Sequence, residues 1–153
     1  MIAAPSSGSG KTTITLGLLK ALAKKGLDVC GYKAGPDYID RAFLEQASGK
    51  PAGNLDMHIQ GVDGMHYSLS RAPAEYCIVE GVMGYFDGIA NTYQNSCYDL
   101  SRTLDIPTLL IYSPKGEMFS VIPKIKGMVD FPDSRIKAIL FNNVTERYYS
   151  MLK

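Results

Sequence analysis

The sequence predicts an α/β protein in which a mostly parallel sheet carries helices on both of its faces. Segments with the apolar character of buried strands alternate along the chain with segments of helical period, and this alternation is typical of parallel sheets. The chain has 153 residues, no internal repeat and no linker-like segment. We therefore expect a single domain.

The first half of the chain is predicted to hold two strands and two helices. The predicted elements are a strand ending at Ala4, a helix from Lys11 to about Lys25, a strand over 27–33 and a helix over 39–48. Ile14, Leu18 and Leu22 recur at helical spacing in the first helix. Gly26 and Gly49 follow the two helices and mark where each one stops.

The second half of the chain is predicted to add three strands. The predicted elements are a loop over 50–66, a strand over 75–80, a long loop over 81–95, a short helix holding Leu100 and Leu104, a strand over 108–112, a helix over 119–129, a strand over 136–141 and a helix that begins near Met151. Pro123 should kink its helix or lie in the first turn. The length of the loop over 81–95 suggests that it has a function.

The composition excludes several classes of protein. Hydrophobic residues make up 46% and charged residues 20% of the chain, and the net charge is +1, so we expect neither disorder nor a broad basic face for nucleic acid. We find no apolar run long enough for a membrane helix and no signal peptide. Three cysteines without a CxxC spacing fit a reducing compartment. We therefore predict a cytoplasmic protein.

A phosphate-binding loop is predicted near the N-terminus. The segment PSSGSGKTT lies between a predicted strand and a predicted helix, which is the context of a P-loop, so the fold should be P-loop NTPase-like. Gly8 and Gly10 let backbone N–H groups turn toward a phosphate. Lys11 should reach the β- and γ-phosphates, and the Thr12 hydroxyl should ligate Mg²⁺. The nucleotide-binding residues predicted here are Ser7, Gly8, Ser9, Gly10, Lys11, Thr12 and Thr13.

Two positions of this loop depart from known patterns. Pro5 stands where the strict P-loop pattern has its first glycine. Ser6 stands where partitioning-type dimeric ATPases carry a second lysine, and this disfavours that type. A loop that merely caps a helix is the alternative, but Gly-Lys-Thr-Thr in this context is specific to P-loops.

Acidic residues follow two of the predicted strands. Asp37 and Asp40 come after the second strand, and Glu80 ends a later one. Because ligands gather at the carboxyl ends of parallel strands, we expect these carboxylates to converge on the nucleotide. Glu80 is the natural partner of Thr12 in a Mg²⁺ site, Asp37 is a second candidate ligand, and Lys33 could neutralise a phosphate or a carboxylate. A helix cap for Asp37 and a solvated surface position for Asp40 remain alternatives.

Aromatic and histidine side chains are predicted mainly to be structural. Tyr85, Phe86 and Tyr93 fall in the long loop after Glu80. Packing of that loop on the sheet is favoured, and covering a flat macrocycle is the alternative. His58 and His66 have no metal-ligand spacing and are expected at the surface or in loops.

Taken together, four segments resemble the cobyrinic acid a,c-diamide synthase family. They are APSSGSGKTT at 4–13, YKAGPDYID at 32–40, NLD at 54–56 and EGVMGYFDG at 80–88, and the likeness runs through ILFNN at 139–143. GPDYID discriminates this family from the related cobyric acid synthases. Dethiobiotin synthetase shares the fold and the P-loop but lacks this motif, so the resemblance implies a dethiobiotin synthetase-like fold.

The resemblance implies a ligase. Members of the family amidate the a and c acetate carboxylates of a corrin-type macrocycle in cobalamin biosynthesis. They use ATP, Mg²⁺ and glutamine, and the carboxylate is first activated as an acyl phosphate. The protein then contributes mainly positioning and charge neutralisation.

The resemblance also implies a role for each site residue. The implied roles are catalysis for Asp37, Asp40 and Lys11, Mg²⁺ binding for Thr12, Glu80 and Asp37, substrate binding for Tyr38, and nucleotide binding for Lys33, Asn142 and the P-loop residues given above. Asn142 corresponds to the Asn that reaches the adenine edge in dethiobiotin synthetase relatives. The adjacent Asn143 is an alternative for that role.

One departure from the family concerns length. Members carry a C-terminal glutaminase domain with a Cys nucleophile, and this chain ends before it. We therefore expect residues 1–153 to be one ATP-binding amide-synthetase domain, truncated and without its own ammonia source. Cys30, Cys77 and Cys97 are expected to be structural thiols. The expected partners are a corrin-type substrate and a glutaminase domain, and the sequence leaves a homodimer open.

Two other functions remain as alternatives. The first is the same chemistry on nickel sirohydrochlorin, because the sequence does not distinguish among tetrapyrroles. The second is a P-loop ATPase that acts as a partner-binding switch. Ser6 counts against the switch, and the GPDYID motif has no evident role in it.

Overall fold

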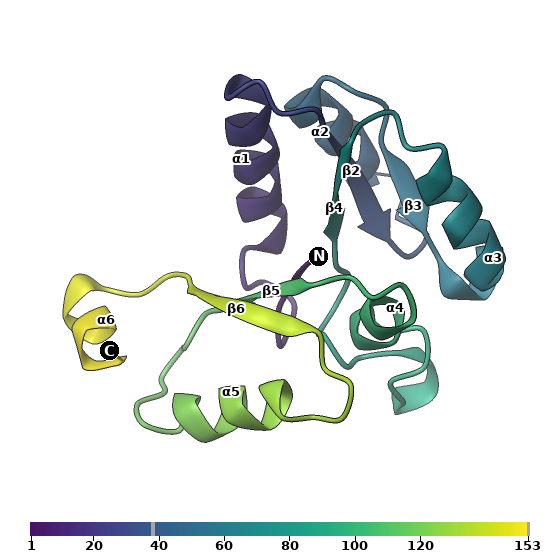
Figure 1. The fold of residues 1–153 in the computed structure, drawn as a ribbon. Coiled ribbons are helices and arrows are strands. Elements are labelled where there is room, and N and C mark those ends of the chain that lie inside the picture. Colours follow the sequence, from purple (N-terminus) through teal and green to yellow (C-terminus); the bar gives the residue numbers. More distant parts are fainter. Residues whose placement is uncertain (38, 153) are drawn as a thin grey trace.

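Six parallel strands form one sheet in the order β3-β2-β4-β1-β5-β6. The computed structural model describes residues 1–37 and 39–152, and Figure 1 shows the arrangement. The strands are β1 (Ile2–Ala3), β2 (Val29–Ala34), β3 (Gly53–Leu55), β4 (Tyr76–Glu80), β5 (Thr108–Tyr112) and β6 (Ile136–Phe141). The predicted parallel α/β fold is confirmed.

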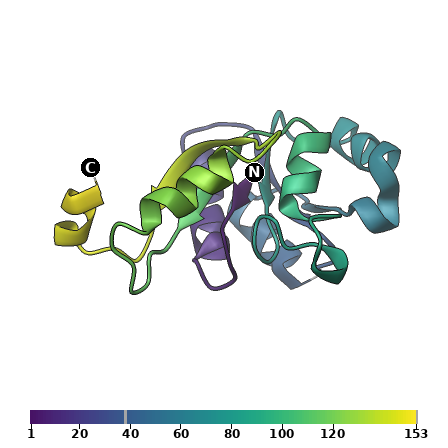
Figure 2. The same ribbon diagram turned by 90° about the horizontal axis from the view of Figure 1, so that it is seen from below.

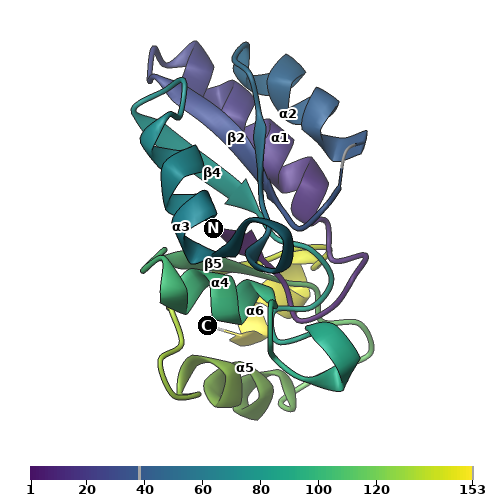
Figure 3. The ribbon, with the colours of Figure 1, turned by 90° about the vertical axis from the view of Figure 1, so that its right-hand side faces the viewer.

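Helices cover both faces of the sheet, as the alternation of elements predicts. The helices are α1 (Lys11–Lys24), α2 (Ile39–Ser48), α3 (Met57–Ser70), α4 (Cys97–Thr103), α5 (Val121–Val129) and α6 (Glu146–Leu152), with a short 3₁₀ helix η1 at Ile89–Asn91. Helices α1 and α2 lie on one face, and α3, α4 and α5 lie on the other (Figure 3). Helix α6 extends beyond the sheet on the side of β6 (Figure 2). Among the described residues, no helix has the length and apolar character needed to cross a membrane.

Two apolar layers hold the helices to the sheet. On the α1–α2 side, Leu19 and Leu44 are fully buried against Val29. Helix α2 packs so closely on β2 that a Cβ atom at Gly31 would lie 2.8 Å from Leu44 Cβ, so this strand position requires glycine. The other layer is larger and brings together side chains from α3, α4, α5 and the loop after β4. Burying a leucine of this kind contributes about 2–5 kcal/mol, judged by the cost of Leu→Ala substitutions.

The prediction of a loop over residues 50–66 is wrong. The segment holds strand β3 and most of helix α3. The segment holds three glycines, Gly53, Gly61 and Gly64, which obscure its pattern. Gly53 leaves room for the Tyr32 ring, and Gly61 has φ 66° and ψ 176°, which interrupts α3. Strand β3 forms because β2 offers it a parallel partner, and an edge pairing of three residues leaves little trace in the sequence.

The remaining elements agree with the predictions within a few residues. Helix α2 and strands β5 and β6 have the predicted bounds. Pro123 lies in the first turn of α5, where its missing N–H costs nothing. Helix α6 begins at Glu146 and not near Met151. The earlier start was missed because the first turn opens with charged residues and carries no apolar stripe.

Candidate active site

The P-loop joins β1 to α1 and opens on a cavity. Gly8 and Gly10 have φ values of 76° and 93°, and the first turn of α1 has no side-chain cap, so its N–H groups are available to an anion. Ser9 closes the loop by donating from its hydroxyl to the Ser6 carbonyl at 3.0 Å. The cavity measures about 350 Å³ and is lined by Ser7, Gly8, Gly10, Lys11, Thr12, Thr13, Lys33, Glu80, Gly81, Val82 and Met83.

Lys11 lies against the loop that follows β4. Its Nζ donates to the Met83 carbonyl at 2.6 Å and to the Ser6 carbonyl at 3.3 Å. Burial lowers the pKa of Lys11. The Lys11 ammonium therefore bridges the P-loop and the opposite wall of the cavity. A phosphate that entered the cavity would contact this ammonium.

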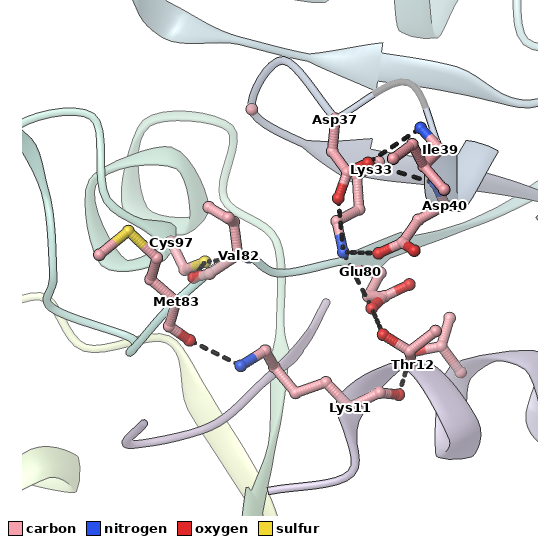
Figure 4. A network of polar contacts seen from close by, with 12 residues as sticks. Lys11, Thr12, Lys33, Asp37, Ile39, Asp40, Glu80, Val82, Met83 and Cys97 are labelled. Carbon is pink, nitrogen blue, oxygen red and sulfur yellow. Dashed lines mark hydrogen bonds and ion pairs between the residues drawn. The ribbon is translucent and has the colours of Figure 1, made fainter. Parts of the chain in front are cut away.

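Lys33 lies among three carboxylates at the carboxyl ends of β2 and β4. Its Nζ donates to Asp40 Oδ2 at 2.7 Å and to Glu80 Oε1 at 3.0 Å, and it lies 3.7 Å from Asp37 Oδ2 (Figure 4). Parallel pairing sets Lys33 beside Glu80 across the two strands. Burial acts to lower the pKa of Lys33, but its bonds to Asp40 and Glu80 outweigh burial, so the net pKa is raised. Lys33 is therefore positively charged at neutral pH.

Glu80 links this cluster to the P-loop. Its side chain is fully buried, and its Oε1 accepts from the Thr12 hydroxyl as well as from Lys33 (Figure 4). Within the described part of the protein, Glu80 Oε2 has no hydrogen-bond partner. A buried carboxylate oxygen left unpaired is costly unless another group satisfies it. The three carboxylates predicted to converge, Asp37, Asp40 and Glu80, thus meet around Lys33 beside Thr12. Their contact with a nucleotide stays a prediction.

Asp37 is both a helix cap and a member of the carboxylate cluster around Lys33, and both positions were predicted for it. Its Oδ1 accepts from the backbone N–H groups of Ile39 and Asp40, at 3.1 and 3.2 Å, and so caps the first turn of α2. Burial acts to raise the pKa of Asp37, but these bonds and the charge of Lys33 lower it overall. Lys33 lies between Asp37 and Glu80 (Figure 4). Tyr38, the predicted substrate contact, lies outside the described residues.

Asn54 positions the loop after β2, a role that was not predicted from the NLD motif. Its Nδ2 donates to the carbonyls of Gly35 and Asp37, at 2.8 and 2.9 Å, and the Gly35 N–H donates to Leu55 at 2.8 Å. Strand β3 therefore holds the loop that carries Asp37 and leads into α2, where Asp40 lies. The NLD motif includes Asn54, but because residues 50–66 were predicted to be a loop, no structural role was predicted for its side chain.

The loop after β4 is built around buried side chains. Tyr85 is fully buried against Phe86 and Tyr98, which confirms the predicted packing for that ring. The Cys97 thiol accepts from the Val82 N–H and donates to its carbonyl, both at 3.2 Å, and burial raises the pKa of Cys97. This thiol is structural, as predicted.

A second cavity adjoins the first. It measures about 320 Å³ and lies between the loop after β2, the start of α3 and the loop after β4. Val82 and Met83 line both cavities. The second cavity is mostly apolar, with Pro36, Leu55, Met57, Ile59, Ile89 and Leu100 among its lining.

Asn142 lies at the end of β6 beside the P-loop. Its Nδ2 donates to the Ser9 carbonyl at 2.9 Å, and a Cβ atom at Gly10 would approach it to 2.3 Å. Asn143, the alternative, is exposed and donates instead to Ser113 Oγ at 3.2 Å. Contact of Asn142 with an adenine stays a prediction.

Comparison with known protein families gives this geometry a context. The family model of the CobQ/CobB/MinD/ParA nucleotide binding domain (CbiA) matches residues 1–150. The chain belongs to this family. Nucleotide binding by a CobQ/CobB/MinD/ParA domain accounts for a P-loop whose lysine and threonine face a cavity.

Several relatives of the CobQ/CobB/MinD/ParA domain are diamide synthases. The chain is 45% identical to the cobyrinate a,c-diamide synthase of Clostridium tetani and 46% identical to that of Clostridium acetobutylicum, over its full length. It is 40% identical to the hydrogenobyrinate a,c-diamide synthase of Brucella anthropi. It spans 35% of the two clostridial proteins and 36% of the Brucella protein.

Proposed function

We propose that this domain catalyses the ATP-dependent amidation of the a and c acetate carboxylates of a corrin-type macrocycle, in cobalamin biosynthesis. The observation that carries the proposal is the placement of Lys33, which joins Glu80 of the phosphate cavity to Asp40 and Asp37 of the GPDYID segment. One cluster thus connects the phosphate cavity to a segment that lies outside the P-loop. The names of the similar synthases support the same activity.

The nucleotide half of the site would bind ATP and Mg²⁺. Residues 7–13 would enclose the phosphates, Lys11 would neutralise them, and Asn142 would contact the adenine edge. Mg²⁺ prefers hard oxygen ligands. The Thr12 hydroxyl and the Glu80 carboxylate, which bonds that hydroxyl through Oε1 and has an unpaired Oε2, fit that preference. Thr12 and Glu80 would hold the ion, with Asp37 as a further ligand, and the bound ion would neutralise charge on the phosphates.

The acceptor half would activate and then amidate a carboxylate. An acetate oxygen attacks the γ-phosphorus, the bond from that phosphorus to the bridging oxygen breaks, and ADP leaves. Ammonia then attacks the carbonyl carbon of the acyl phosphate, and inorganic phosphate leaves. The nitrogen loses one proton as the amide forms, and the Asp40 carboxylate is placed to accept it. Lys33 would hold the acetate and the γ-phosphate together, and Tyr38 would contact the macrocycle.

The ammonia would come from elsewhere in a longer protein. We propose that residues 1–153 are the synthetase part of a cytoplasmic enzyme whose glutaminase domain hydrolyses glutamine. Within the described residues, Cys30 and Cys97 are buried and Cys77 lies 3.5 Å from Cys30 between their sulfur atoms. Such thiols lack the exposed, base-activated setting of a glutaminase nucleophile.

The activity is tested on the full-length protein with cobyrinic acid, ATP, Mg²⁺ and ammonium chloride. We expect two successive mass losses of about one dalton per acetate converted to amide, with one ADP released per amide. Lys11→Ala should abolish both products. Absence of any amide with cobyrinic acid or hydrogenobyrinic acid would overturn the proposal. If nickel sirohydrochlorin alone were amidated, it would replace the corrin-type macrocycle as the proposed substrate.

A further inference from the structure

Three large apolar side chains stand exposed around the second cavity. Ile59 of α3 is 67% exposed, Met83 of the loop after β4 is 55% exposed, and Ile89 of η1 is 47% exposed. They come from three separate segments of the chain. Exposed apolar side chains gathered on the rim of one cavity mark a binding site rather than a random surface.

We propose that this second cavity is the macrocycle-binding site and that Ile59, Met83 and Ile89 contact the face of the corrin ring. The inference rests on the proposed function and adds the location of the acceptor. A flat, largely apolar ring matches an open apolar cavity, and its carboxylate-bearing edge extends beyond the apolar contact. The ring would lie over the opening, because about 320 Å³ accommodates part of such a molecule.

The position of the cavity lets a side chain of the macrocycle reach the reacting groups. Val82 and Met83 line both cavities, so the two cavities meet at these residues. Gly35 also lines the second cavity, and a Cβ atom there would lie 3.7 Å from Val82 Cγ1. An acetate that passes Val82 therefore enters the cavity that holds Lys33 and Glu80, while the ring stays outside the phosphate site.

The charged side chains of the lining are two carboxylates held by backbone contacts and one histidine. The Asp56 carboxylate is occupied as the cap of α3, where it accepts from the N–H groups of His58 and Ile59 at 2.9 and 3.0 Å. The Asp87 carboxylate accepts from the Gly84 N–H at 3.0 Å. His58 is the only residue in the described lining whose side chain can become cationic. Each acidic side chain thus has an oxygen occupied by backbone donors, and His58 is the side chain that can pair with a carboxylate of the ligand.

Ile59→Ser and Ile89→Ser test the proposal in the full-length protein. Cobyrinic acid absorbs visible light, so its dissociation constant can be measured by equilibrium dialysis. We expect each substitution to weaken its binding about tenfold, because apolar contact with the ring is lost. The dissociation constant of a non-hydrolysable ATP analogue should stay within about twofold. Because both side chains are exposed, the variants should keep the wild-type circular dichroism spectrum.

A matched control separates this site from the rest of the surface. Ile122 is 41% exposed on α5 and does not line the cavity, so Ile122→Ser should leave both dissociation constants unchanged. Unchanged cobyrinic acid affinity in both test variants, with the wild type still forming amides, would overturn the location and leave the function standing. A wild-type protein that neither binds nor amidates cobyrinic acid would overturn the function itself.

Discussion

Lys33 shows how a single buried charge can organise a site. One ammonium lies within 4 Å of three carboxylates, so the cluster keeps an excess of negative charge. That excess attracts a second cation. The cation could be Mg²⁺ bound to the phosphates, or an ammonium ion that is deprotonated before it reacts. Removing one partner of a buried pair leaves an uncompensated charge, so each member of the cluster constrains the others.

Asp37 makes a contribution to stability that depends on pH. Its lowered pKa means that the carboxylate stabilises the fold above its unfolded pKa of about 3.9, and that this stabilisation is lost as the pH falls through the lower folded value. We expect Asp37→Ala to reduce the free energy of unfolding by about 0.5–2 kcal/mol at pH 7, the usual cost of a lost helix cap. Urea denaturation at pH 7 and pH 3 measures the free energy of unfolding of both proteins. The difference from wild type should shrink at pH 3, and Asp37→Asn, which keeps a capping oxygen, should lose less at pH 7.

Asp40 should affect chemistry more than nucleotide binding. Its carboxylate contacts Lys33, and among the described residues it makes no hydrogen bond or ion pair with the P-loop. In the full-length protein we expect Asp40→Asn to lower kcat about a hundredfold or more, the usual effect of losing a proton acceptor. The KM for ATP should change little, because only an interaction of the transition state is lost. Steady-state kinetics decide the point: a large rise in the KM for ATP with kcat preserved would place Asp40 at the nucleotide instead.

At the scale of elements, strand β3, which was not predicted from the sequence, holds the segment that joins β2 to α2. Strand β3 has three residues, yet its Asn54 side chain and Leu55 carbonyl together make three hydrogen bonds to the Gly35–Asp37 segment. Edge pairing and an interrupted helix leave no periodic signal. In contrast, strands such as β5 and β6, and the stripe of α1, carried enough apolar pattern to be predicted.

We expect Asn54→Ala to lower kcat in the full-length enzyme about tenfold to a hundredfold, because Asp40 is then held less accurately. The affinity for an ATP analogue, measured by calorimetry, should stay within about twofold, since Asn54 does not touch the P-loop.

Ser48→Ala is the matched control at the other end of α2, where the Ser48 hydroxyl donates to the Leu44 carbonyl at 2.9 Å. It should lower the thermal midpoint and leave kcat unchanged. Equal losses of kcat in the two variants would show that Asn54 acts only through general stability.

At the scale of the whole molecule, the sequence was informative where residues act through their own chain neighbours. The P-loop, the alternation of strands and helices and the acidic strand ends were all visible. Contacts between distant segments were not, and they include the Asn54 bonds, the Cys97 thiol on Val82 and the adjoining cavities. These depend on how crossovers bring loops together at one edge of the sheet, which a single sequence does not encode locally.

The hydrogen bond from Lys11 to the Met83 carbonyl sets up a competition. A phosphate and that carbonyl need the same ammonium, and Met83, held at φ 49°, borders the cavity proposed for the macrocycle. Nucleotide binding should therefore release Met83 to close on the ring and strengthen macrocycle binding about fivefold or more, and by linkage the macrocycle must strengthen nucleotide binding equally. Calorimetry measures this factor when each ligand is titrated into the protein alone and into the protein already saturated with the other ligand. Lys11→Ala without nucleotide should bind cobyrinic acid as tightly as wild type with nucleotide, whereas wild-type affinities that are independent of one another would mean that the two ligands do not communicate.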